Sequence, residues 1–182
     1  MVSRDEKDLH TLLLERWQHM QKTWKEKHVD KAQPFLTCTY RSPEEQAKLV
    51  ASGKSRAQPG QSLHNYKPAL AFDVAFAKAD GSLDWNPATF TLWGELAESL
   101  GLEWGGRWAG FFDGPHVQLP MTWQDAKAGK IPRLEPLTKP SEPVPSYKLF
   151  SRANEPLGTL EGRVVEGKLY VVSLVVKGQT IL

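Results

Sequence analysis

Residues 62–77 read SLHNYKPALAFDVAFA and place a histidine, His64, shortly before a strand that carries an aspartate. From Ala69 to Ala77, large apolar side chains alternate with smaller ones, which is the pattern of a strand whose successive side chains point to opposite faces. Asp73 shares its face with two alanines, which leave open space around the carboxylate. A metal or a substrate needs such space, so this stretch predicts a functional site on one face of a sheet.

Helical and strand patterns surround this stretch on both sides. Apolar residues recur at helical spacing from Leu9 to Trp24 and predict an amphipathic helix. A short β-prone run, 35–40, ends before Arg41, and a capping serine at position 42 with a proline after it begins a second helix that ends near Gly53. A third helix is predicted from Pro87 until just before the glycine at 101.

A second polar face follows in residues 111–119, FFDGPHVQL. In this run His116 and Gln118 point to one side of an extended chain and their apolar neighbours point to the other. Together with His64 and Asp73, this makes two histidines and one carboxylate, a common protein ligand set for catalytic zinc that leaves a fourth coordination position open. Hydrolysis at such a metal also needs a base and a positive charge. Asp113 and Arg41, respectively, can supply them.

Composition limits what these motifs can mean. The chain has 182 residues and 40% hydrophobic content, enough for one good core and a small appendage. A net charge of +2 is too small to argue for nucleic acid as a partner. Cys38 is the single cysteine, so there is no internal disulfide and no cysteine-based structural zinc site. Any metal is therefore expected to bind histidine and carboxylate.

The N-terminal segment MVSRDEKDLHTLLLERW has neither the apolar core nor the cleavage site of a secretory signal. No stretch of the sequence approaches the length of a membrane span. We therefore expect a chain that is made in the cytoplasm, does not insert into membranes, and reaches any target beyond the membrane only after release by another factor.

Three motifs follow one another in the sequence. They are Tyr40-Arg41-Ser42 with Gln46, Ser62-x-His64 leading to Ala71-x-Asp73, and Trp104-Gly-Gly-x-Trp108 leading to Asp113-x-Pro-His116-x-Gln118. Together they resemble the motifs of the VanY-like zinc peptidases, over roughly residues 9–120. That family includes D-alanyl-D-alanine carboxypeptidases and L-alanyl-D-glutamate endopeptidases, many of the latter being bacteriophage endolysins.

The resemblance implies an α+β fold in which helices flank a small central antiparallel sheet. Carried over residue by residue, it makes His64, Asp73 and His116 the ligands of a zinc ion. It makes Asp113 the general base and Arg41 the residue that polarises the scissile carbonyl. Four further residues are candidate substrate contacts, although the two tryptophans can equally be core aromatics beside a Gly-Gly turn: Ser62, Gln46, Trp104 and Trp108.

Two departures from the family pattern stand out. Lys67 and Pro68 look like an inserted pair between the first histidine and the aspartate, and Arg107 occupies a position where similar endopeptidases usually carry aspartate. Because Pro68 precedes the strand, the insertion is expected to loop out without moving Asp73 to the other face. Neither departure changes a ligand.

The function that the resemblance implies is cleavage of the peptidoglycan stem peptide, by an L-alanyl-D-glutamate endopeptidase of endolysin type that we expect to be a monomer. An aspartate rather than a glutamate as base, together with the Trp-Gly-Gly-x-Trp segment, favours this subclass. The alternatives are a D-alanyl-D-alanine carboxypeptidase, a non-catalytic wall-binding module, and a zinc hydrolase that acts on peptides outside the wall.

The chain changes character after the motifs. We predict a catalytic domain over residues 1–130, a Pro-rich linker over 131–146 and a short β-rich segment over 147–182. Residues 168–177 are the strongest strand run, with turns predicted at Gly158, Gly162 and Gly167. This last segment is expected to bind cell wall, to pack on the catalytic domain, or to be part of a larger module.

Overall fold

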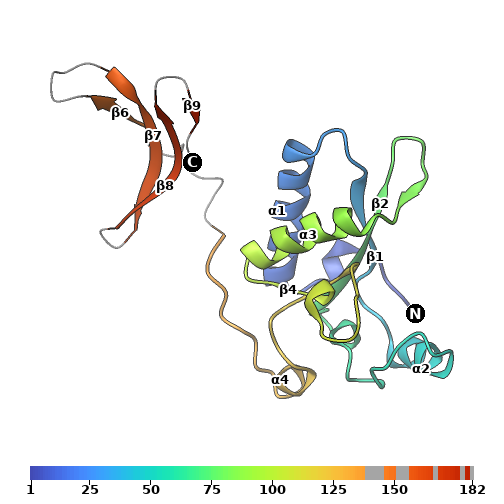
Figure 1. Ribbon diagram of the computed structural model, residues 1–182. Helices are drawn as coiled ribbons and strands as arrows, with labels where there is room; N and C mark the ends of the chain where they lie inside the picture. Colours follow the sequence, from blue (N-terminus) through green and yellow to red (C-terminus); the bar gives the residue numbers. More distant parts are fainter. Residues whose placement is uncertain (138–145, 151–155, 166–167, 177–178, 181–182) are drawn as a thin grey trace. The chain divides into compact units, whose positions relative to one another are not determined.

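The computed structural model describes residues 1–137, 146–150, 156–165, 168–176 and 179–180, and it divides the chain into two compact units, 1–137 and 138–182. Figure 1 shows the elements of both units. The helices of the first unit are α1 (Thr11–Lys27), α2 (Pro43–Ala51), α3 (Pro87–Ser99) and α4 (Trp123–Lys127), with short 3₁₀ turns η1 (Glu6–Asp8), η2 (Leu63–Asn65) and η3 (Gly105–Arg107). Its strands are β1 (Gln33–Cys38), β2 (Ala71–Ala77), β3 (Leu83–Asp84), β4 (Glu103–Trp104) and β5 (His116–Gln118).

The strands of the first unit form one antiparallel sheet in the order β1-β2-β5-β4, with β3 paired to β2. Across β2 and β5, Asp73 is paired with His116, and across β1 and β2, Cys38 is paired with Asp73. The predicted α+β fold with a small antiparallel sheet is confirmed. Its register places residues from distant parts of the sequence side by side at the centre of the sheet.

Aromatic side chains fill the space between the sheet and the helices α1 and α3, which lie side by side in Figure 1. Trp17 of α1 meets Phe72 of β2 edge-on at 5.5 Å between ring centroids and meets Trp93 of α3 at 5.8 Å. Trp24 and Phe76 make a further aromatic contact, tilted by 46°, at 5.1 Å between ring centroids. Such pairs add about 0.5–1.5 kcal/mol each beyond the burial of their area, so this core is a rigid support for β2.

The helix boundaries follow local capping chemistry. Ser42 Oγ accepts a hydrogen bond from the Glu45 amide at the start of α2, as the sequence predicts, and Gly53 after the helix has a φ of +70°. The first helix, α1, starts at Thr11 and not at Leu9. Leu9 instead forms an isolated bridge with Ala69, so it belongs to the core but not to the helix.

Arg16 is a buried charge that the hydrophobic pattern of α1 did not reveal. Its side chain is 1% exposed, and it donates to the carbonyls of Leu100 at 2.9 Å and Glu135 at 2.7 Å. These bonds satisfy the guanidinium inside the protein. The second bond also holds the segment after α4 against α1.

The inserted pair lies in the turn before β2. The Lys67–Pro68 peptide bond is cis, and the chain enters β2 at Ala71 with Asp73 facing the same site as His116. The expectation that the insertion leaves the face of Asp73 unchanged is confirmed.

The second unit is an antiparallel sheet in the order β6-β7-β8-β9, made of β6 (Ser146–Phe150), β7 (Pro156–Val165), β8 (Lys168–Val176) and β9 (Gln179–Thr180). The prediction of turns at Gly158 and Gly162 is wrong, because both residues lie inside β7. Gly162 marks an irregularity instead, since the register between β7 and β8 shifts there. The third predicted turn, at Gly167, lies outside the described residues.

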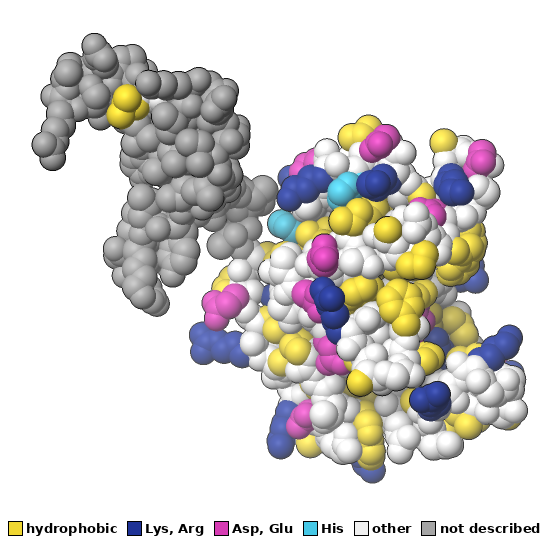
Figure 2. All heavy atoms as spheres, in the orientation of Figure 1, with side chains coloured by type: hydrophobic (Ala, Val, Ile, Leu, Met, Phe, Trp, Pro, Cys, Tyr) yellow, Lys and Arg dark blue, Asp and Glu magenta, His cyan; other side chains and the backbone are white. Residues whose placement is uncertain are grey.

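Charged side chains of both signs share the face of the first unit that Figure 2 shows. On the face shown in Figure 2, Lys and Arg side chains are interspersed with Asp and Glu side chains and do not gather into one basic patch. Among the helices that the structure describes, none combines the length and the hydropathy needed to cross a bilayer.

Candidate metal centre and active-site cleft

Three side chains converge where η2, β2 and β5 meet. His64 Nε2 lies 3.1 Å from Asp73 Oδ1, and His116 Nδ1 lies 3.0 Å from the same oxygen. The two ring nitrogens are 3.3 Å apart. Three ligands of a tetrahedral zinc ion at about 2.0–2.1 Å from the metal lie about 3.3 Å from one another. The three donor atoms therefore have the spacing of one face of a zinc tetrahedron.

The second nitrogen of each histidine is already hydrogen-bonded. His64 Nδ1 lies 2.8 Å from the carbonyl oxygen of Thr39, which can only accept, so this nitrogen carries a hydrogen and Nε2 faces the cluster. His116 Nε2 lies 3.0 Å from Gln118 Oε1, so Nδ1 is the atom that faces the cluster. Histidine ligands usually donate their outer N–H to such acceptors, which fixes the ring and its tautomer. The donor set therefore fits a metal of the zinc type.

Burial and charge act in opposite directions on this cluster. Burial alone would lower the pKa of His64, but the neighbouring Asp73 carboxylate outweighs it and raises that pKa to about 10. Burial likewise would raise the pKa of Asp73, but His64 and His116 hold it well below its usual range. The cluster therefore favours a positive charge beside Asp73, which a proton or a metal cation can supply.

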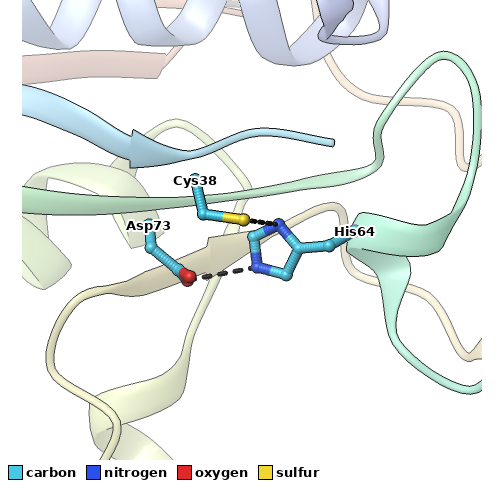
Figure 3. Close-up of side chains that lie close together, drawn as sticks. All are labelled: Cys38, His64 and Asp73. Carbon is cyan, nitrogen blue, oxygen red and sulfur yellow. Dashed lines mark hydrogen bonds and ion pairs between the residues drawn. The ribbon is translucent and has the colours of Figure 1, made fainter. Parts of the chain in front are cut away.

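Cys38 lies beside the cluster, and Figure 3 shows it with His64 and Asp73. These three residues form a second group with metal-ligating atoms close together. However, Cys38 Sγ is 3.5 Å from Nδ1 of His64, the nitrogen that also bonds the Thr39 carbonyl. A metal held by Cys38 through that nitrogen would have to displace this carbonyl, whereas His116 Nδ1 lies on the same side as His64 Nε2 and Asp73 Oδ1.

Arg41 connects the cluster to the helix α2. Its Nη2 donates to Asp73 Oδ2 at 3.3 Å, and its Nη1 donates to Gln46 Oε1 at 3.1 Å. Gln46 in turn donates to Ser55 Oγ at 2.8 Å and to the Ala57 carbonyl at 2.7 Å. Gln46 is completely buried, so its prediction as a substrate contact is wrong, and it orients Arg41 instead.

Asp113 lies at the edge of the cluster on the chain that leads into β5. Its amide donates to the Gly105 carbonyl at 3.1 Å, and its own carbonyl accepts from the His116 amide at 3.2 Å. Among the described residues, none donates a hydrogen bond to the Asp113 carboxylate. Burial raises the pKa of this carboxyl group, with opposing contributions from the charges of the cluster.

A cleft of about 1150 Å³ opens above these residues. Its lining includes Arg41, His64, Asp73, Asp113 and His116. Trp108 and Phe111 form part of its wall, with ring planes 18° apart, and the Arg56 guanidinium lies 5.6 Å from the Phe111 centroid.

The remaining predicted residues separate into two groups. Ser62 lines the cleft, and its hydroxyl also accepts from the His64 amide at the start of η2. Trp108 lines the cleft as well. Trp104, in contrast, is 2% exposed and donates to the Gly114 carbonyl at 2.8 Å, so its prediction as a substrate contact is wrong. Arg107 pairs with Glu98 of α3 at 3.2 Å and is not part of the cleft lining.

Two residues of the site were missed by sequence reasoning. Cys38 was considered only as a structural ligand, although it ends the strand that precedes Arg41 and so sits close to the motif. Glu103 begins β4, and both of its oxygens accept hydrogen bonds, from Trp108 and Gln118. Its pairing with Gln118 depends on the register of β4 and β5, which no local sequence signal reveals.

Comparison with known proteins identifies the family of this chain and supports its fold. The chain belongs to the M15 family of peptidases: a family model described as D-alanyl-D-alanine carboxypeptidase matches residues 55–119, a range that contains all three proposed ligands. The chain is 33% identical over 128 residues to the peptidoglycan L-alanyl-D-glutamate endopeptidase CwlK of Bacillus subtilis strain 168, over 62% of this chain and 74% of that protein.

Two further proteins are similar to this chain, one over a short stretch of sequence and one at low sequence identity. The L-alanyl-D-glutamate peptidase of Listeria phage A118 is 40% identical over 84 residues, which cover 44% of this chain and 28% of that protein. The crystal structure of the Serratia marcescens L-Ala D-Glu endopeptidase ChiX superposes with a TM-score of 0.53 at 23% identity, covering 69% of this chain and 92% of that one. At this identity the structural match supports the fold.

Proposed function

We propose that this chain is a zinc-dependent endopeptidase that cleaves the L-alanyl-D-glutamate bond of the peptidoglycan stem peptide. The observation that carries the proposal is the spacing of 3.0–3.3 Å among the three donor atoms of His64, Asp73 and His116 at the bottom of a cleft. The named activities of the two sequence relatives support the choice of bond.

The chemistry then divides among residues that the structure brings together. When bound, zinc supplies Lewis-acid polarisation and lowers the pKa of water. Asp113 has a carboxylate free of hydrogen-bond donors among the described residues, and it is the group that takes the proton from the attacking water. Arg41 lines the cleft with a side chain that is 14% exposed, and its positive charge stabilises the oxygen of the scissile carbonyl.

A second activity, D-alanyl-D-alanine carboxypeptidase, is kept because the matching family model carries that description. The two activities release different products from the same substrate. A carboxypeptidase removes a terminal D-alanine, whereas the endopeptidase separates the stem peptide between its first and second residues.

Mass spectrometry of purified peptidoglycan after digestion tests the proposal. We expect new amino termini on glutamate, and we expect them to disappear when a chelator is present and to return when zinc is added. Release of D-alanine alone would establish the carboxypeptidase instead, and intact stem peptides at full zinc loading would favour a non-catalytic wall-binding module.

A further inference from the structure

His116 is connected to Trp108 by a chain of hydrogen bonds that passes through Gln118 and Glu103. Gln118 Oε1 is 3.0 Å from His116 Nε2, and Gln118 Nε2 donates to Glu103 Oε2 at 3.2 Å. The other carboxylate oxygen of Glu103 accepts from Trp108 Nε1 at 2.6 Å. Glu103 and Gln118 face each other directly because they are paired across β4 and β5. Both oxygens of Glu103 are therefore occupied by donors.

Which group donates and which accepts in each of these hydrogen bonds follows from the chemistry of the side chains. A carboxylate can only accept, so Glu103 requires Gln118 to turn its NH₂ group toward it. The carboxamide then has only its oxygen to offer to His116. That oxygen requires a hydrogen on Nε2 of His116, so in the neutral imidazole the lone pair lies on Nδ1, the atom that faces Asp73 at 3.0 Å.

We propose that Glu103 is a positioning residue that sets the metal-binding tautomer of His116 by orienting the Gln118 amide. This inference rests on the proposed metal site. It assigns to Glu103 a role different from that of a base, because its two oxygens accept from Trp108 and Gln118.

Glu103→Gln changes the nearer of the two acceptors of the Gln118 NH₂ group, the other being the Met121 carbonyl at 3.5 Å, and keeps the size of the side chain. A glutamine has one accepting oxygen, whereas Trp108 and Gln118 both present N–H groups. If the oxygen serves Trp108, the amide of Gln118 rotates and presents its NH₂ group to His116. His116 must then accept at Nε2 and carry its hydrogen on Nδ1, where it blocks the metal.

The zinc affinity of the full chain tests this mechanism. Protein stripped with a chelator is titrated with zinc in competition with a chromophoric chelator. We expect Glu103→Gln to bind zinc about 10- to 100-fold more weakly than wild type, the usual range for loss of a residue that orients a ligand. Glu103→Asp keeps two accepting oxygens and is expected to stay closer to the wild-type value.

A double variant distinguishes this mechanism from general damage. Trp108→Phe removes the competing N–H donor, so the oxygen of a glutamine at position 103 becomes free to accept from Gln118. We expect Trp108→Phe combined with Glu103→Gln to recover most of the zinc affinity that Glu103→Gln loses. The melting temperatures of all metal-free variants serve as the control for folding.

The outcomes separate this inference from the proposed function. A wild-type chain that binds zinc and cleaves peptidoglycan, together with a Glu103→Gln variant of equal zinc affinity, would overturn the role of Glu103 alone. The same holds if the double variant binds zinc no better than Glu103→Gln. A wild-type chain that binds no zinc would overturn the metal site and this inference with it.

Discussion

Arg41 donates a hydrogen bond from Nη2 to Oδ2 of Asp73 at 3.3 Å, on the side of the carboxylate opposite the two histidines. The bond keeps Oδ1 directed at His64 and His116 and stabilises the charge of Asp73. Arg41 therefore contacts the proposed ligand Asp73 and also lines the cleft. The first contact predicts an effect of Arg41 on zinc binding, and the second predicts an effect on kcat.

Arg41→Ala is expected to weaken zinc binding about tenfold, because Asp73 loses the donor that orients it. It is also expected to lower kcat by roughly 10²-fold, the scale for loss of one group that stabilises an oxyanion. The measurement is kcat at saturating zinc, where occupancy no longer limits the rate. Full recovery of kcat under that condition would mean that Arg41 acts on Asp73 alone.

Gly105 packs closely against Asp113 and His116, and it can do so because it has no side chain. A Cβ at this position would lie 2.7 Å from the Asp113 carbonyl oxygen and 3.2 Å from the Cβ of His116. Gly105→Ala must therefore displace the proposed base, the proposed ligand, or both. We expect a stability loss of about 1–3 kcal/mol from overpacking and a rate loss of about 10²-fold from misplaced groups.

Gly81→Ala is the matched control for this change. Gly81 has a φ of +83° and open space around its Cβ position, and it does not line the cleft. Its substitution costs stability through the backbone but leaves the site untouched. Thermal unfolding and peptide cleavage are measured for both variants. Equal loss of rate in the two would show that stability, and not the geometry at Gly105, explains the effect.

The ligands could be predicted from the sequence because each lies in a short motif with clear alternation. Asp73 is flanked by alanines on its own face, and His116 follows a Gly-Pro corner that starts a new strand. The fold class followed from the family resemblance and from capping signals such as Ser42 before Pro43.

The residues around the ligands were less predictable because their roles depend on tertiary contacts. Trp104 is a core residue because Gly94 and Gly106 leave room for its ring, and that packing joins segments far apart in sequence. Gln46 faces inward because Arg41 and the loop at Ser55 surround it. Sequence periodicity predicts which face of a helix or strand a residue occupies, but it does not predict the hydrogen-bond partners that the residue meets there.

Zinc affinity is expected to increase with pH across the neutral range. In the metal-free protein Asp73 raises the pKa of His64 to about 10, against the effect of burial, so zinc must displace a proton at neutral pH. Release of one proton makes the apparent affinity rise about tenfold per pH unit until pH approaches that pKa. Calorimetry in buffers of different ionisation enthalpy counts the protons released, and a count of zero would contradict the expectation.

The same raised pKa makes the metal-free fold less stable as the pH rises, whereas zinc affinity increases with pH. A group whose pKa is raised on folding stabilises the protein fully below its unfolded pKa, about 6.5 for histidine. This contribution is lost as the pH rises toward 10. Chemical denaturation of stripped protein should therefore show stability falling from pH 7 to pH 9, and His64→Gln should flatten that decline.

Asp113 provides the test that separates metal binding from catalysis. Its carboxylate has no hydrogen-bond donor among the described residues, and burial raises the pKa of its carboxyl group above the usual value. Asp113→Asn keeps the shape and the backbone bonds to Gly105 and His116 but removes the basic oxygen. We expect wild-type zinc affinity and folding, with a loss of about 10²- to 10⁴-fold in kcat.

The pH profile and one comparison variant complete this test. The wild-type kcat/KM should fall on the acid side as Asp113 becomes protonated. Asp73→Asn should instead lose zinc, since it replaces an oxygen that faces both histidines. If Asp113→Asn cleaves peptides at close to the wild-type rate, another group is the base. If it loses zinc while Asp73→Asn keeps it, the ligand and the base have been exchanged in our assignment.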